Sequence, residues 1–165
     1  MDQNRINSDN DEYSENAYYL RGKLIDTFNT MEKCIESFIV NYFMPNNSKM
    51  FDFQSIILDR LIFQSKKEVF FELMKQEQRK RGFIKRKNNA WPYSRLFKDI
   101  TEMQDERNRF AHYYLAKPSI LRDEVIVLIE FRDSVKLHRY NQIKYNDLIE
   151  RVKSLVDEIT NIGKI

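Results

Sequence analysis

The sequence predicts a mainly α-helical bundle with a small β-hairpin before its last helix, and three observations lead to this prediction. The chain has only three glycines and three prolines in 165 residues, fewer than the many turns of an all-β domain require. Apolar residues recur at spacings of three and four over most of the chain, which is the period of one helix face. One apolar, β-branched run departs from that period and has the composition of strands.

The first helix is expected from about residue 14 to residue 44, where the segment MPNNS ends it. Its apolar residues share one face. They are Ala17, Leu20, Leu24, Phe28, Met31, Ile35, Phe38 and Tyr42. Residues 1–13 carry few apolar side chains, so we expect a disordered lead before a single domain that covers 14–165.

The next two helices flank a basic segment. Apolar spacing predicts a helix over about 53–79, with a bend near 64–67 where the period lapses. Residues 79–92 are expected to form an exposed loop, because six of the first nine are basic and a glycine and a proline interrupt it. The third helix is expected to begin near 92–94 and to end before Pro118, since proline cannot continue it.

The period changes in the last third of the chain. The run EVIVLIEF opens a β-hairpin predicted over about 124–140, with a turn at 132–134. A last helix follows over about 144–162, and Gly163 stops it. Its apolar face consists of Leu148, Val152, Leu155, Ile159 and Ile162.

The composition excludes several classes of protein. Cys34 is the only cysteine, so the chain has no internal disulfide and suits a reducing compartment. With only two histidines besides, and no glycine motif for phosphate, we predict neither a metal nor a cofactor. No apolar run is long enough to span a bilayer, and the first residues are too polar for a signal peptide. These features favour a cytoplasmic protein without membrane contact.

Arg107 interrupts an apolar seam on the third helix. The seam has spacings of four, three, four, three and four, and its other members are Leu96, Ile100, Met103, Phe110 and Tyr114. A buried arginine without a partner is costly, and no acidic residue lies three or four positions away on the same helix. A structural ion pair with another helix is one interpretation. The other is that this face of the helix is partly open.

Two further polar residues accompany Arg107. Asn108 and His112 are four apart, which places them on one neighbouring face of the helix. They are either an ordinary solvated flank near the carboxyl end of a helix, where a cationic histidine is favoured, or part of a catalytic site. The second interpretation has a chemical basis, because histidine exchanges protons near neutral pH and arginine binds phosphate through two hydrogen bonds.

The segment resembles the motif of the HEPN superfamily (higher eukaryotes and prokaryotes nucleotide-binding domain). Members are small helical bundles in which an arginine, a polar residue and a few further residues precede a histidine. Here these are Arg107, Asn108, three residues and His112, late in the third predicted helix. The toxin branch adds any residue and then a tyrosine, which matches Tyr114. The resemblance implies a four-to-five-helix HEPN-like bundle, to which the β-hairpin is an addition that not all members carry.

The resemblance also implies a function, that of a metal-independent endoribonuclease serving as a toxin or in phage defence. Members act as homodimers whose motif helices meet across a cleft, so a composite site would hold Arg107 and His112 of both chains. His112 would transfer protons, Arg107 would bind the phosphate of RNA, and Asn108 would position either group. Tyr114 would accept AMP from a nucleotidyltransferase-type antitoxin; alternatively, it is simply the next residue of the seam.

The basic segment is a second candidate site. The net charge of +3 does not itself imply a polyanionic partner, but six clustered cations can bind the phosphates of RNA. They are Arg79, Lys80, Arg81, Lys85, Arg86 and Lys87. A solvated loop between helices is the other interpretation. His138, in the second strand of the hairpin, is expected to be a surface residue.

Two functions of other classes remain open. A non-catalytic HEPN-like dimeric regulator or scaffold would use the same face to bind protein or nucleotide. A plain nucleic-acid-binding module would act through the basic segment. Substitution of Arg107 and His112 separates the ribonuclease from both.

Overall fold

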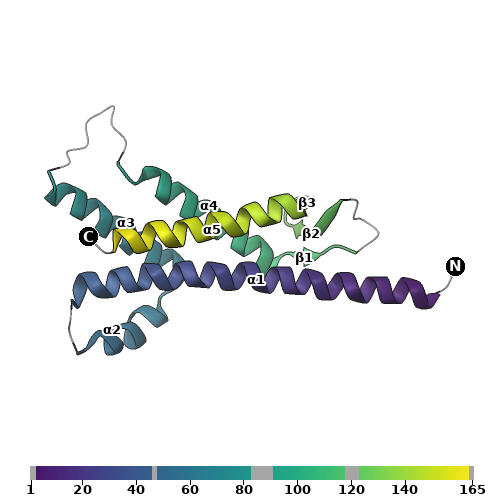
Figure 1. Ribbon diagram of the computed structural model, residues 1–165, viewed down its shortest axis with the longest axis horizontal. Helices are drawn as coiled ribbons and strands as arrows, with labels where there is room; N and C mark the ends of the chain where they lie inside the picture. The colour runs from purple at the N-terminus through teal and green to yellow at the C-terminus, as the bar shows by residue number, and fades with distance from the viewer. Residues whose placement is uncertain (1–2, 46–47, 83–90, 118–122, 164–165) are drawn as a thin grey trace. The chain divides into compact units, whose positions relative to one another are not determined.

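The computed structural model describes residues 3–45, 48–82, 91–117 and 123–163 (Figure 1). It confirms a mainly helical fold with a small hairpin before the last helix. The elements in chain order are α1 (Gln3–Phe43), α2 (Met50–Ile56), the short 3-10 helix η1 (Leu58–Arg60), α3 (Phe63–Lys80), α4 (Ser94–His112), β1 (Tyr114–Leu115), β2 (Glu124–Phe131), β3 (Val135–Asn141) and α5 (Gln142–Ile162). None of the helices described is long and apolar enough to cross a membrane.

α1 is longer than the sequence analysis predicted. It begins at Gln3, where we expected a disordered lead over 1–13. No glycine or proline interrupts residues 3–21, so no helix-breaking residue stops the helix from extending toward the amino terminus. The predicted apolar face is buried over most of its length, as shown by Ala17, Leu20, Leu24, Phe28, Met31 and Ile35, which are at most 6% exposed.

The helix expected over about 53–79 is two helices, α2 and α3, joined by η1. Leu61 and Ile62 have extended backbone, with ψ angles of 138° and 156°, so the break precedes the bend expected at 64–67. Leu58 in η1 is 2% exposed, and its burial favours a turn of the chain at this point. Apolar spacing does not reveal the break, since Ile62 continues the stripe but is 71% exposed.

The predicted hairpin is confirmed. β2 and β3 pair antiparallel from Glu124 opposite Asn141 to Phe131 opposite Val135, around the turn expected at 132–134. Asn141 also begins α5, because its side-chain oxygen accepts a hydrogen bond of 2.9 Å from the backbone amide of Lys144. The predicted apolar residues of α5 are largely buried, namely Leu148, Val152, Leu155 and Ile159.

A third strand, β1, was not predicted. α4 ends at His112, and the next residues pair with β2, with Tyr114 opposite Ile129, in a sheet of order β1-β2-β3. The backbone amide of Ala116 continues this pairing with a 2.9 Å bond to the carbonyl of Val127. Figure 1 shows the chain passing from α4 through this sheet into α5. The third helix therefore ends well before Pro118, because backbone pairing with β2 replaces the helical hydrogen bonds.

Contacts within the chain group into two compact units. The first comprises residues 1–28 and 102–152, and the second comprises 29–101 and 153–165. α1, α4 and α5 each contribute to both. The single domain expected over 14–165 stays a prediction.

The first unit is centred on aromatic side chains around the sheet. The rings of Phe110 and Tyr140 lie 4.8 Å apart edge to face, and both residues are at most 1% exposed. The buried hydroxyl of Tyr145 donates to the carbonyl of Leu20 at 2.9 Å, which satisfies its polar group. Burial of this hydroxyl, with a smaller effect of Tyr19, raises the pKa of Tyr145 to about 12, so it remains a donor at neutral pH.

The second unit combines an aromatic core with a buried ion cluster. The ring of Phe70 meets that of Phe38 edge to face at 5.0 Å. Nζ of Lys66 lies 2.6 Å from carboxylate oxygens of both Glu32 and Glu36. Lys66 and Glu36 are at most 4% exposed, so each supplies the partner that a buried charge requires.

Candidate active site

The apolar seam of α4 is closed within one chain. Leu96, Ile100, Met103 and Phe110 are at most 2% exposed. The face that we expected to be partly open is therefore closed at these four positions. Arg107 is only half-buried in the seam, and its guanidinium carbon lies 5.9 Å from the centroid of the Phe28 ring, where a cation is favoured.

Arg107 makes no ion pair with any of the described residues, so the interpretation as a structural ion pair has no support there. Its Nη1 donates to Oδ1 of Asn108 at 3.3 Å. Its Nε is buried and has no hydrogen-bond partner in the described part of the chain. The arginine is thus a cation with one buried, unused donor, Nε, and it is directly linked to the next polar residue of the motif.

The carboxyl end of α4 is fixed by a residue of α1. Arg21 donates to the carbonyls of Phe110 (2.7 Å), Ala111 (3.4 Å) and Tyr113 (3.1 Å). These carbonyls have no partner within the helix, and a cation is favoured at this end of the helix dipole. Arg21 therefore holds the helix end on which His112 lies.

Asn108 and His112 line one hollow of about 550 Å³. The other residues that line it are Asp105, Arg109, Tyr113, Glu130 and Arg132. His112 is exposed and Asn108 half-buried, one helical turn apart as predicted. Arg107 is not among the lining residues and reaches the hollow only through Asn108, whereas Arg109 and Arg132 line it directly.

Glu130 is the most enclosed titratable group of this hollow. It is 8% exposed, and its Oε2 lies 3.0 Å from Nε2 of His138. The hydroxyl of Tyr113 also donates to it, and Nε of Arg132 lies 3.7 Å from its Oε1. The hydrogen bond with His138 has the largest effect and lowers the pKa of Glu130. Burial raises this pKa and the bond from Tyr113 lowers it, and the net result is a pKa below the ordinary value. Glu130 is therefore a carboxylate at neutral pH.

Tyr113 and His138 support Glu130 together. Their rings lie 5.2 Å apart, and the side chain of His138 is only 21% exposed. Burial and the bond to Glu130 raise the pKa of Tyr113, so it stays protonated and continues to donate. His138 is thus less exposed than the surface residue we expected, and it is part of the group around the hollow.

A signal for this group was present in the sequence. A three-residue turn at 132–134 places Phe131 opposite Val135 and Glu130 opposite Lys136. His138 is two residues further along β3, hence a diagonal neighbour of Glu130 on the same face. The contact of His138 with Tyr113 was not predictable, because it depends on the end of α4 at His112 and on the start of β1, and β1 was not predicted.

Arg109 is held at the hollow by a second carboxylate. Glu106 pairs with Nη1 of Arg109 and accepts a 2.7 Å hydrogen bond from the hydroxyl of Tyr140. Burial and this bond raise the pKa of Tyr140, so the tyrosine remains a donor. Glu106 thus fixes the position of Arg109 and offsets part of its charge.

Tyr114 lies on the other face of the sheet from Glu130. Its partner Ile129 precedes Glu130 in β2, and neighbouring strand residues point to opposite faces. Tyr114 is 68% exposed, and its ring meets that of Phe131 edge to face at 5.5 Å. It belongs to β1, so the alternative that it continues the helical seam is wrong.

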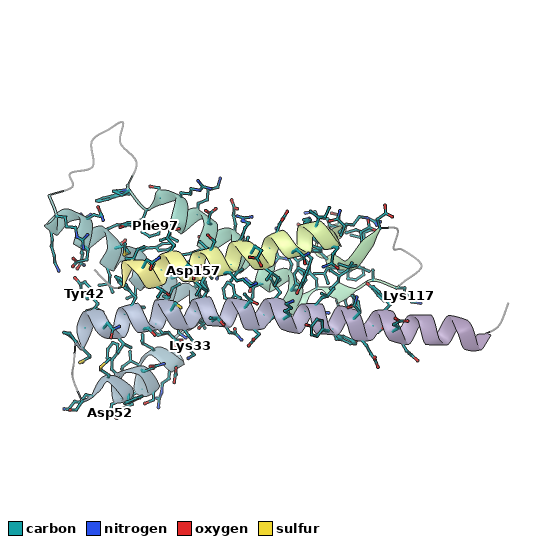
Figure 2. The ribbon with its side chains drawn as sticks, viewed as in Figure 1. Lys33, Tyr42, Asp52, Phe97, Lys117 and Asp157 are labelled. Carbon is teal, nitrogen blue, oxygen red and sulfur yellow. The ribbon has the colours of Figure 1, made fainter. Side chains whose placement is uncertain are left out.

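The described basic candidates belong to the second unit, at the end of α3. Lys80 bonds to Glu77 at 2.7 Å and to the hydroxyl of Tyr42 at 2.9 Å; Figure 2 labels Tyr42 near the end of α1. Arg79 lies over the ring of Trp91, 5.5 Å from its centroid. Arg81 lines a hollow of about 280 Å³. This hollow also has the aromatic residues Phe38, Tyr42 and Tyr93 in its wall. Lys85, Arg86 and Lys87 lie outside the described residues.

Comparison with known proteins does not assign the chain to a family. A scan against protein-family models matched none, and searches of the curated proteins and of the solved structures found no match. Among the residues that the structure describes, no three His, Cys, Asp or Glu side chains gather as a metal site requires.

Proposed function

We propose that the chain is a metal-independent endoribonuclease of HEPN type, with a role as a toxin or in phage defence. The observation that carries the proposal is the hollow at the end of α4. Asn108 and His112 of the motif line it together with two arginines, Arg109 and Arg132. A proton-transfer group beside two cations suits a phosphodiester, whose cleavage needs both proton transfer and stabilisation of negative charge.

The residues are assigned from their places at the hollow. His112 is exposed to the hollow and transfers the proton. Arg109 and Arg132 bind the phosphate. Arg107 donates to Asn108 and thereby orients the amide that lines the hollow. This assignment makes Arg107 a positioning residue, whereas the family resemblance gives it direct contact with phosphate.

Two partners belong to the proposal through the family resemblance. One is a second copy of the chain, in a homodimer. The other is a nucleotidyltransferase-type antitoxin that attaches AMP to Tyr114, and the 68% exposure of this side chain supports it as an accessible acceptor.

The experiment compares wild type with His112→Ala and Arg107→Ala in a bacterial host and in a cleavage assay on total RNA. Arg95→Ala is the matched control, since the Arg95 side chain lies on the same helix and is 94% exposed. Wild type and the control are expected to slow growth and cut RNA, and the two motif variants to lose both effects. Intact RNA with wild type, at the same protein level, would contradict the proposal.

The second candidate function is a non-catalytic HEPN-like dimeric regulator or scaffold. A specific observation favours it, namely an exposed apolar group on the face of the sheet opposite Glu130. Its members are Tyr114, Phe131, Val135 and Leu137, each at least 41% exposed. Such a group is typical of a protein-binding surface. A Phe131→Asp variant that abolishes the growth effect while His112→Ala keeps it would select this function.

A further inference from the structure

We infer that Glu130 is the general base and His112 the general acid of the proposed reaction, so that one chain carries both proton-transfer groups. The inference rests on the proposed ribonuclease function. It replaces the second histidine that a partner chain would otherwise have to supply. The two residues come from different elements, β2 and α4, and line the same hollow.

Glu130 has the surroundings of a working carboxylate. It is 8% exposed, yet its side chain lines the hollow. His138 bonds to its Oε2 at 3.0 Å, and Tyr113 also donates to it. His138 does not itself line the hollow, so it acts through Glu130 as a positioning residue.

The charges around Glu130 keep it ionised. Arg132 lies two residues after it in the chain, Lys136 and His138 face it from β3, and Tyr113, the first residue after α4, bonds to it. Arg109 completes the cationic side of the hollow. The pKa of Glu130 is lowered by the bond to His138, which is the largest cause, and also by the bond from Tyr113 and the charge of Lys136, while burial acts in the opposite direction. A carboxylate can therefore accept a proton over the pH range in which an imidazolium can still give one.

A second ion pair between these strands lacks the features that make Glu130 a candidate base. Glu124 and Arg139 pair at 2.9 Å between β2 and β3, as Glu130 and His138 do. Glu124 does not line the hollow, and its partner is an arginine that does not release its proton. The hollow and the titratable partner thus distinguish Glu130 from an ordinary cross-strand ion pair.

The reaction balances with the groups of one chain. The carboxylate of Glu130 takes the proton of a ribose 2′-hydroxyl, and the 2′-oxygen forms a bond to phosphorus. The bond from phosphorus to the 5′-oxygen breaks, and the imidazolium of His112 gives its proton to that oxygen. The products are a 2′,3′-cyclic phosphate and a 5′-hydroxyl. Arg109 and Arg132 offset the added negative charge.

The first test is Glu130→Gln, assayed on a short RNA oligonucleotide. It is expected to lower the cleavage rate by about 10²- to 10⁴-fold, the usual contribution of a general base. Glu124→Gln, on the same strand, is the matched control and should cleave as wild type does. An oligonucleotide that lacks the 2′-hydroxyl at the cleaved position should resist wild type. If Glu130→Gln cleaves as fast as wild type, the inference is wrong while the proposed function stands.

Circular dichroism shows whether Glu130→Gln is folded. If it is not, Glu130→Asp takes its place, because it keeps the charge and shortens the reach. This variant should cleave more slowly than wild type and still lose activity in acid. A rate equal to that of wild type would overturn the inference. A wild type that leaves RNA intact overturns the proposed function, and the inference with it.

The second test asks whether the two groups act within one chain. Glu130→Gln and His112→Asn are co-expressed with different tags, and preparations carrying both tags are assayed. No activity is expected, because neither chain has a complete site. Recovery of cleavage would show that Glu130 of one chain works with His112 of another, which would overturn the single-chain assignment.

Discussion

Glu36 and Glu130 are both buried carboxylates with several hydrogen-bond donors, but their surroundings differ. Glu36 is 1% exposed and accepts from Lys66 (2.6 Å), Lys33 (2.7 Å) and Gln54 (3.3 Å). Two of its three donors are lysines, which are permanently charged at neutral pH. Glu36 does not line either of the two hollows described above.

Glu130 instead has a histidine and a tyrosine as its donors and lines a hollow. Neither of these donors is a lysine, and the nearby cation Arg132 lies farther away, with its Nε 3.7 Å from Oε1 of Glu130. Burial and a network of bonds alone therefore do not identify a catalytic carboxylate. Glu130 differs from Glu36 because it lines a hollow and because neither of its hydrogen-bond donors is a lysine.

The largest effect on stability is expected at the first carboxylate. Lys66→Met leaves the buried Glu36 and the half-buried Glu32 with one cation fewer, and it should lower the free energy of unfolding by about 3–5 kcal/mol. Lys33→Met is the control, since this partner of Glu36 is 61% exposed and should contribute about 0–1 kcal/mol. Urea unfolding measures both. Equal losses of stability would show that the buried pair of Lys66 with Glu36 contributes no more than the exposed pair of Lys33 with Glu36.

A pH profile tests the second carboxylate. His138→Ala removes the largest cause of the lowered pKa of Glu130, so this pKa should rise toward its ordinary value. Because the base must be deprotonated, the acidic limb of the cleavage profile should move to higher pH. Tyr113→Phe removes a smaller cause and should move the limb less. An unchanged acidic limb in both variants would show that Glu130 does not set it.

The basic end of α3 should affect RNA affinity and not the rate at saturation. Replacing Arg79 and Arg81 by alanine should weaken binding to single-stranded RNA. It should also reduce the salt slope by about 0.7 for each phosphate that is no longer neutralised. Arg95→Ala is again the control, because Arg95 is 94% exposed and lies in another helix. Binding measured over a series of salt concentrations gives the slope. A slope equal to that of wild type would remove these arginines from the RNA site.

The smallest effect is expected at Tyr114. Tyr114→Phe should leave cleavage unchanged, since Tyr114 lies on the face of the sheet opposite Glu130 and loses only an exposed hydroxyl. A marked loss of cleavage would place this tyrosine in the reaction. Mass spectrometry after incubation with a nucleotidyltransferase antitoxin should show AMP on wild type and none on the variant.

Some of the site was predictable because it depends on local geometry. Asn108 and His112 lie one turn apart on α4, a relation that the helical period alone establishes. The hairpin turn at 132–134 likewise fixes which residues of β2 and β3 share a face. The break between α2 and α3 was not predictable in this way, since burial of Leu58 and not a glycine or proline accompanies it.

What the sequence by itself determined is therefore the set of helix faces, the hairpin and the motif on α4. Only the tertiary structure turned Arg107 toward Phe28, closed the seam around it and ended α4 at His112. It also brought Glu130 to the hollow that His112 lines. The physical reason is distance along the chain: residue spacing encodes neighbours within a helix or hairpin, whereas contacts between α4 and β2 depend on how those elements pack.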